Sequence, residues 1–479
     1  MSKTKIESTL ENKQNQKISI HNSSSAVFFA LYNPVNDIDT EISLLNHFLL
    51  KRGIKDVVAR VEIRNLDGSL YKTFTLRMDK EHVYSIKLSD YVTTIFVGSI
   101  YIFFNSKQNL AVPFCAVISS IKSKNSVCSV HTYGRRLEPN ELDGNLDMKK
   151  TVEMGWTARD SSNIKSFAVL HGGAYPLNLS VKLEILNHRK KILNINLSHN
   201  LNPYATKVLI PQSESDEIIS HLNENKGHIK IFVDGLKGVF PRMLCGNFTH
   251  MHDDILIEAN EIQFTHTNFD FYKIEQPDAS SNFGYFNQPS LDNGYGIIYP
   301  IKTNKDISID GEQYKSDSLQ EFNVKKMSQV KISSRNENLP SRFVAAIIGK
   351  WKGFHLESEC SSGTFIEDYL RVPCHWHWGL LKPGFAEGIG KISVLKCRFG
   401  NKKDSDRKLN LRLFDSKSLL YERVISITDY EEIDTSEYLN QVSHSGPIWY
   451  ALSGDTLEDL NIYATFYPKG KAGFVEHAF

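Results

Sequence analysis

Residues 460–479 read LNIYATFYPKGKAGFVEHAF, and their pattern of apolar and polar side chains recurs elsewhere in the chain. Apolar side chains occupy every second position from Leu460 to Phe466, which is the period of a strand with one buried face. Pro468 and the glycines after it mark a turn, and residues 474–479 read as a returning strand. The sequence therefore predicts a β-hairpin at this place.

The same pattern occurs near the start of the chain. Residues 59–76 hold a strictly alternating strand, an Asn-Leu-Asp-Gly turn and a return strand. Ile63 matches Leu413, 350 residues later, and His131 matches His477, 346 residues later. Because the offset is nearly constant, the first and last thirds of the chain are predicted to be copies of one module.

A looser copy occupies the middle of the chain. There Val181 takes the place of Val61, and His266 takes that of His131, with offsets that grow from 120 to 135 residues. Each copy is expected to open with one earlier apolar strand, at residues 26–31, 166–170 and 392–397.

The predicted fold is all-β, with three tandem antiparallel β-sandwich modules of jelly-roll or immunoglobulin-like type. A β-rich insertion precedes the third module, because a structureless loop of that length is improbable. The predicted segments are a disordered lead at 1–16, the first module at 17–136, a linker at 137–150, the second module at 151–270, the insertion at 271–373 and the third module at 374–479.

Composition narrows the classes of function. Lys and Arg number 56 and Asp and Glu 55, so no charge excess indicates a nucleic-acid partner. No run of eighteen apolar residues exists, and a membrane-spanning helix is not expected. The first sixteen residues lack the apolar core of a secretory signal, and the six cysteines form no Cys-x-x-Cys pair. We therefore expect reduced thiols and a cytoplasmic protein.

The three closing histidines, His131, His266 and His477, form one candidate metal site. If the modules pack around a common axis, the three imidazoles converge and can hold a transition metal such as Zn²⁺. If the modules lie in a row, each histidine bonds within its own module. We expect the protein to have no cofactor, and the alternative is a bound divalent transition metal.

A second cluster is PCHWHW at residues 373–378. In a strand, His375 and His377 point to one face, as a metal site requires, and Cys374 shares the other face with Trp376 and Trp378. No further ligand pair stands at a diagnostic spacing, so an aromatic packing or ligand-binding strand is the preferred interpretation.

Aromatic and charged side chains mark candidate ligand contacts. Trp156 can stack on a sugar ring while Arg159 and Asp160 bond its hydroxyl groups, although an Arg-Asp pair that staples the linker to the sandwich is the alternative. The other candidates are aromatic residues in the insertion and in the cluster at 373–378: Tyr285, Tyr295, Trp376 and Trp378.

Repeated modules without a complete catalytic motif favour a non-enzymatic binding or assembly protein, whose partner is a carbohydrate or a protein. His171-Gly172-Gly173 resembles an esterase oxyanion loop, but no Gly-x-Ser-x-Gly elbow accompanies it. The alternatives are a metal-dependent enzyme acting on a glycan or small polar substrate, and a structural component of a larger particle.

Overall fold

The computed structural model consists mainly of antiparallel strands, which confirms the predicted all-β sandwich fold. It describes residues 22–107, 116–131, 151–159, 163–189, 191–223, 226–236, 243–250, 255–265, 283–289, 291–299, 307–315, 319–323, 325–334, 345–361, 365–366, 373–397 and 406–479. No helix in these ranges is long and apolar enough to cross a membrane.

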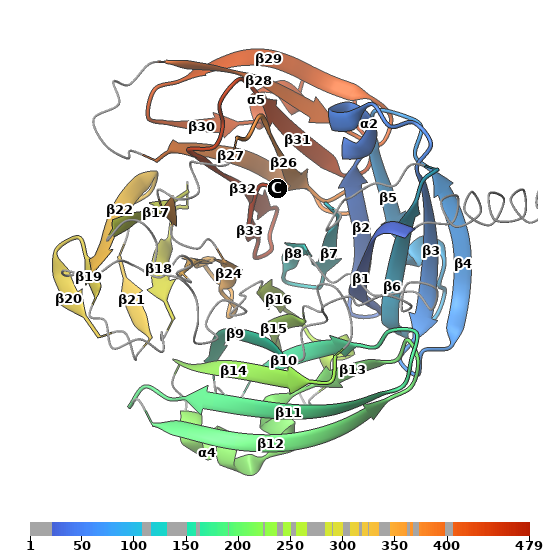
Figure 1. Cartoon of the computed structure of the whole chain (residues 1–479), viewed down its shortest axis with the longest axis vertical. Coiled ribbons are helices and arrows are strands. Elements are labelled where there is room, and N and C mark those ends of the chain that lie inside the picture. The colour runs from blue at the N-terminus through green and yellow to red at the C-terminus, as the bar shows by residue number, and fades with distance from the viewer. Residues whose placement is uncertain are drawn as a thin grey trace, which may run out of the picture.

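Eight strands form the first sandwich, which we call unit A (Figure 1). They are β1 (Asn22–Tyr32), β2 (Asp39–Leu45), β3 (Val58–Asn65), β4 (Leu70–Arg77), β5 (Val83–Lys87), β6 (Phe96–Asn105), β7 (Ile118–Lys122) and β8 (Val127–His131). The helix α2 (His47–Arg52) and the 3-10 turn η1 (Leu88–Asp90) connect them. Two four-stranded sheets result, in the orders β1-β6-β3-β4 and β5-β2-β7-β8.

Unit B follows with another eight strands. They are β9 (Thr151–Arg159), β10 (Ile164–His171), β11 (Leu177–Leu186), β12 (Ile192–Leu201), β13 (Thr206–Leu209), β14 (Lys226–Asp234), β15 (Leu244–Thr249) and β16 (Ile262–Thr265). Its helical segments are α3 (Pro211–Glu214), α4 (Asp216–Leu222) and η3 (Leu256–Glu258).

Unit C lies within the predicted insertion. Its strands are β17 (Phe283–Gln288), β18 (Gly294–Ile298), β19 (Ile307–Ile309), β20 (Glu312–Tyr314), β21 (Gln320–Phe322), β22 (Ser328–Ser334), β23 (Ala345–Gly349) and β24 (Ser358–Ser361). The short strand β25 (Phe365–Ile366) pairs with β17.

Unit D completes the described chain. Its strands are β26 (Trp376–Lys382), β27 (Gly388–Lys396), β28 (Arg407–Phe414), β29 (Leu419–Ile427), β30 (Tyr430–Asp434), β31 (Ile448–Ser453), β32 (Leu460–Pro468) and β33 (Phe474–His477). The helix α5 (Ser436–Leu439) follows β30, as η1 follows β5 in unit A.

All four units share one strand order. In each, the first, sixth, third and fourth strands make one sheet, and the fifth, second, seventh and eighth strands make the other. Unit C therefore has the topology of its neighbours, although its sequence does not show the repeat. Parallel pairing of Thr265 with Glu359 joins the second sheets of units B and C into one eight-stranded sheet.

The predicted opening strand of each module is the first strand in unit A but the second strand in units B and D. Residues 26–31 lie in β1, whereas 166–170 lie in β10 and 392–397 correspond to β27, which are second strands. Their true equivalents are β9 and β26. The reason is that both kinds of strand are largely buried, and a nearly continuous apolar run has no period that distinguishes one from the other.

Alternation decides which side chains enter the cores. Along β11, Val181, Leu183 and Ile185 are buried, while Lys182 and Glu184 between them reach toward solvent. The buried residues pack with Trp156 and strand β14 into the core of unit B. The sheet that contains β11 therefore buries one face in its sandwich, as the period of two predicts, whereas β2 and β10 are buried on both faces.

The four units surround a common centre, where their last strands meet (Figure 1). Strand β8 contacts β16, β16 contacts β24, β24 contacts β33, and β33 contacts β8. The fourth strands β4, β12, β20 and β29 instead lie at the periphery, each at the edge of its sheet. The chain therefore forms a ring, and unit D packs against unit A.

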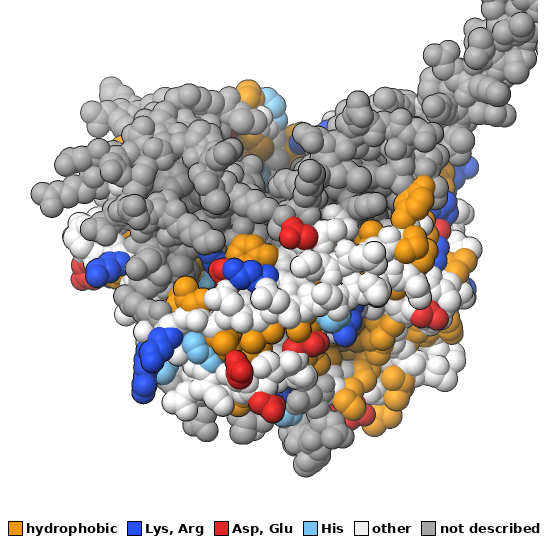
Figure 2. Space-filling view, turned by 60° about the horizontal axis from the view of Figure 1, so that its bottom comes forward, with side chains coloured by type: hydrophobic (Ala, Val, Ile, Leu, Met, Phe, Trp, Pro, Cys, Tyr) orange, Lys and Arg blue, Asp and Glu red, His pale blue; other side chains and the backbone are white. Residues whose placement is uncertain are grey.

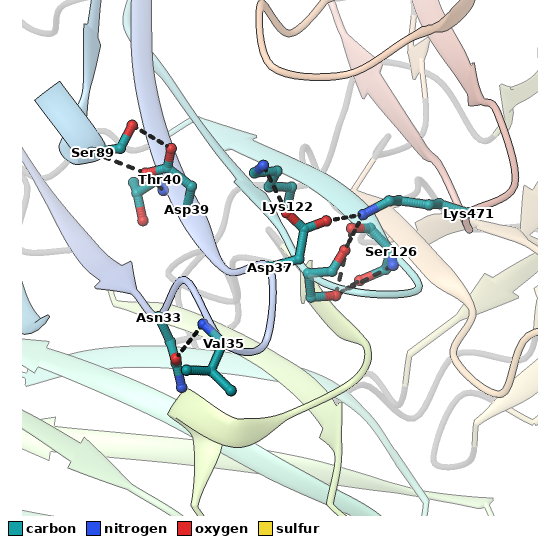
Figure 3. A network of polar contacts seen from close by, with 10 residues as sticks. Asn33, Val35, Asp37, Asp39, Thr40, Ser89, Lys122, Ser126 and Lys471 are labelled. Atoms are coloured by element: carbon teal, nitrogen blue, oxygen red, sulfur yellow. Dashed lines mark hydrogen bonds and ion pairs between the residues drawn. The ribbon is translucent and has the colours of Figure 1, made fainter. Parts of the chain in front are cut away.

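Polar contacts fasten unit D to unit A (Figure 3). The Lys471 ammonium bonds a carboxylate oxygen of Asp37 at 2.7 Å, and Lys122 bonds the other oxygen at 2.8 Å. Alongside, the backbone N–H of Val127 donates to the carbonyl oxygen of Ala472 at 2.8 Å, and the N–H of Ala472 donates to the carbonyl oxygen of Asn125 at 2.8 Å. Trp449, fully buried, donates its indole N–H to the hydroxyl of Ser43 at 3.0 Å. The first and last units thus share a core and a hydrogen-bonded seam.

Candidate functional site

The candidate site lies at the ring centre, where β8 and β33 end. His131 is the last residue of β8 and is fully buried, because units A and D close over it. Its Nδ1 atom lies 2.5 Å from Oε1 of Glu476, whose side chain is also buried. Burial raises the pKa of Glu476 to about 8, although the charge of His477 acts in the opposite direction.

Two further donors complete the cluster. The His477 ring meets the His131 ring edge-on, with 4.5 Å between their centroids. From unit C, the sulfur of Cys360 lies 3.8 Å from Nδ1 of His477. Burial raises the pKa of the Cys360 thiol well above its usual value, and the charge of Glu476 adds to this effect. Three units thus contribute to one buried cluster.

The cluster has the donor types of a transition-metal site. Ligand atoms of His131, Glu476 and His477 all lie within 4.8 Å of one another. No other group of three or more such side chains occurs in the part of the chain that the structure describes. Imidazole, carboxylate and thiolate are the usual ligands of Zn²⁺. Without a metal, the same residues form a buried hydrogen-bonded contact between the first and last units.

Of the three closing histidines, His131 and His477 lie side by side in this structure, and their role as metal ligands stays a prediction. His266, the third member, lies outside the described residues. Neither Glu476 nor Cys360 is among the residues predicted from the sequence. Glu476 is adjacent to His477, and successive strand residues point to opposite faces, so periodicity alone does not bring both to one site. A charged residue inside the apolar strand β33 was the signal that marks it.

Trp156 and Arg159 of the predicted sugar site lie in β9, and Asp160 lies outside the described residues. Trp156 is fully buried in the core of unit B. Arg159 instead forms an ion pair with Glu357 of unit C, at 2.6 Å. Arg159 thus joins units B and C. The predicted Arg159–Asp160 pair cannot be compared with it, because Asp160 lies outside the described residues.

Tyr295 joins the same interface between units B and C. Its hydroxyl donates to Oε2 of Glu357 at 2.8 Å, and Lys226 of unit B lies 3.4 Å from that oxygen. Burial alone would raise the pKa of Glu357, but Lys226, Arg159 and Tyr295 together lower it. A cavity of about 20 Å³ beside Glu357 has room for one water molecule.

The remaining aromatic candidates also pack within the protein. Tyr285 is partly buried in β17, with its ring centroid 6.0 Å from that of Phe283. Trp376 lies under the guanidinium of Arg412, at 4.6 Å. Trp378 is only 8% exposed and stacks on His47 of unit A, with 5.5 Å between centroids.

The predicted faces of the cluster at 373–378 were wrong for Cys374. Its sulfur lies 3.5 Å from Nε2 of His377, the side chain expected on the opposite face. The reason is that β26 begins at Trp376, so the alternation of a strand does not extend to Cys374. His377 also lies 3.1 Å from the carbonyl oxygen of Phe479, and His375 is exposed.

Comparison with known proteins does not assign the chain to a family. No protein-family model matches the sequence, and no curated protein is significantly similar to it.

Proposed function

We propose that the chain is a non-enzymatic assembly protein, copies of which associate by pairing their β12 strands. Strand β12 carries this proposal. It is ten residues long, pairs with β11 in unbroken register from Leu201 to Ile192, and forms the edge of its sheet. Its sequence, ILNINLSHNL, contains no Asp, Glu, Lys, Arg or Pro. Such an edge is a template for a further strand.

The equivalent edge strands of units A and D differ from β12 because they carry charged side chains. Strand β4 carries Lys72 and Arg77, and β29 carries Glu422 and Arg423. Charged side chains on an edge strand discourage pairing with another chain, because a partner strand would have to desolvate them. Of the three long peripheral strands in the described structure, β12 alone lacks this protection.

A second copy of the chain suits this edge. Two β12 strands related by a two-fold axis run antiparallel and present the same surface to each other. Side chains on the outward face of β12 are exposed and uncharged, from Ile192, 60% exposed, to Asn200. Figure 2 turns unit B toward the reader and shows charged side chains scattered among uncharged ones. Self-pairing therefore brings no like charges of β12 together.

A protein contact is better supported than a carbohydrate contact. The aromatic residues that the sequence offered for sugar stacking pack inside the molecule, as Trp156, Trp378 and Tyr295 show. A sugar-binding platform needs an accessible ring face. The edge of β12, by contrast, is exposed at the periphery of the ring.

Sedimentation velocity over a range of concentrations tests the proposal. The protein is expected to self-associate, and Asn194→Lys is expected to shift it to the monomer. Asn194 is exposed and lies opposite Glu184, so a lysine there is compatible with the fold. Val424→Lys on β29 is the matched control and leaves association unchanged, since Val424 is also exposed. A wild-type protein that stays monomeric at high concentration contradicts the proposal.

A further inference from the structure

We propose that the ring centre binds one Zn²⁺ ion, held by Cys360, His477 and the His131–Glu476 pair, which locks units A, C and D together. This proposal does not depend on assembly through β12. It concerns a structural metal, because its ligands come from three units and all except His477 are buried.

The distances fit the first two ligands. A tetrahedral zinc with a Zn–S bond of about 2.3 Å and a Zn–N bond of about 2.0 Å holds its sulfur and nitrogen about 3.5 Å apart. Cys360 Sγ and His477 Nδ1 are 3.8 Å apart, which requires only a small movement. A site with a thiolate and an imidazole binds Zn²⁺ in preference to Mg²⁺ or Ca²⁺, which favour oxygen ligands.

His131 and Glu476 supply the remaining positions, and their ligand atoms and that of His477 lie within 4.8 Å of one another. Cys360 lies outside that group of three, so its sulfur must move toward His131 and Glu476 when the ion binds. Their 2.5 Å separation is shorter than the roughly 3.3 Å between nitrogen and oxygen on a tetrahedral zinc, so loading must part them slightly. The ion takes the place of the proton that the two atoms share. That proton and the thiol proton of Cys360 leave to solvent, as metal binding to protonated ligands requires.

The surroundings match a structural centre. The Tyr450 hydroxyl is buried and has no hydrogen-bond partner among the residues that the structure describes, and its pKa is raised by burial and by the charges of Glu476 and Cys360. Tyr450 belongs to the core of unit D, which keeps this side of the cluster away from solvent. Partly exposed His477 gives the ion a path of entry.

Metal analysis of untagged full-length protein, purified without chelators, tests the site. About one zinc per chain is expected, and Cys360→Ser or His477→Ala should lower zinc affinity by at least about tenfold. Cys397→Ser is the matched control, since Cys397 is a thiol equally buried at 3% exposure that bonds Asn287 instead. This variant should keep its zinc.

Metal binding can also be measured in the wild-type protein by replacing zinc with cobalt. This measurement does not require the variants to fold. After zinc removal by a chelator, Co²⁺ should restore one equivalent of metal with a thiolate-to-cobalt charge-transfer absorption. Wild-type protein that contains no zinc, and whose apo form binds neither Zn²⁺ nor Co²⁺ by calorimetry, overturns the proposal. An ion that Cys360→Ser retains without loss of affinity overturns it as well.

Discussion

His131 and Glu476 are 345 residues apart in the chain, yet Nδ1 of the first lies 2.5 Å from Oε1 of the second. The contact exists because unit D returns to unit A, so that the strand ends β8 and β33 meet at the ring centre. Both side chains are buried, and each satisfies the other.

Removal of either partner should destabilise the ring. His131→Ala or Glu476→Ala leaves a buried polar group without its partner, and we expect a loss of about 3–5 kcal/mol in the free energy of unfolding of metal-free protein. The measurement is urea unfolding, with the double variant completing a mutant cycle. Glu431→Ala, at an exposed position, is the control and should change stability little. Losses that simply add in the double variant would show that the two residues do not interact.

Glu41 should make stability depend on pH. It is buried between units A and D, where the backbone N–H of Gly384 donates to it at 2.5 Å. Burial raises its pKa to about 7, although the bond from Gly384 acts in the opposite direction. The unfolded chain releases this proton near its ordinary pKa of 4.5, while the folded chain keeps it. The free energy of unfolding therefore falls as pH rises through that window.

The full effect of Glu41 between pH 4.5 and 7 is about 3 kcal/mol at most. Urea unfolding across this range should show a shallower pH dependence in Glu41→Gln, since an amide does not titrate but can still accept from Gly384. An unchanged slope in the variant would mean that other groups cause the pH dependence.

Gly68 should tolerate no side chain. Its φ of +90° lies in the region that favours glycine, and a Cβ there would lie 2.1 Å from the carbonyl oxygen of Pro203 in unit B. Gly68→Ala therefore combines backbone strain with a clash at the interface between units A and B, and we expect a loss of about 3 kcal/mol. Thermal unfolding measures it.

Gly53 provides the matched control for that substitution. It also has a positive φ, of +67°, but a Cβ there would meet nothing within 4 Å. Gly53→Ala should cost only about 1 kcal/mol, because the strain of the left-handed backbone remains without the clash. Equal losses in the two variants would show that contact with Pro203 contributes nothing.

Much of the fold was predictable, because alternation and turn signals are local. Val61 and Leu411 do occupy equivalent strands, β3 and β28, as the constant offset indicated. The topology of unit C was not predictable, since its third and fourth strands are only three residues long and show too little periodicity to align.

The candidate site was predictable only in part. Equivalent positions in repeated modules indicated His131 and His477, and their meeting depended on a ring arrangement that no local pattern encodes. Cys360 comes from unit C, which the sequence did not align with the other modules. Trp156 illustrates the opposite case, since an aromatic residue proposed to stack on a sugar is a core side chain of β9.

Disulfide cross-linking through β12 tests whether copies of the chain associate by pairing of this edge strand. A two-fold axis perpendicular to the sheet places outward residues opposite outward residues, and the residue nearest the axis lies closest to its equivalent in the second copy. We predict that mild oxidation of Asn194→Cys, Asn196→Cys and Ser198→Cys, each tested alone, yields covalent dimers for the cysteine nearest the axis, whereas Val424→Cys on β29 yields none. If none of the three β12 positions cross-links more efficiently than position 424, association through β12 is contradicted.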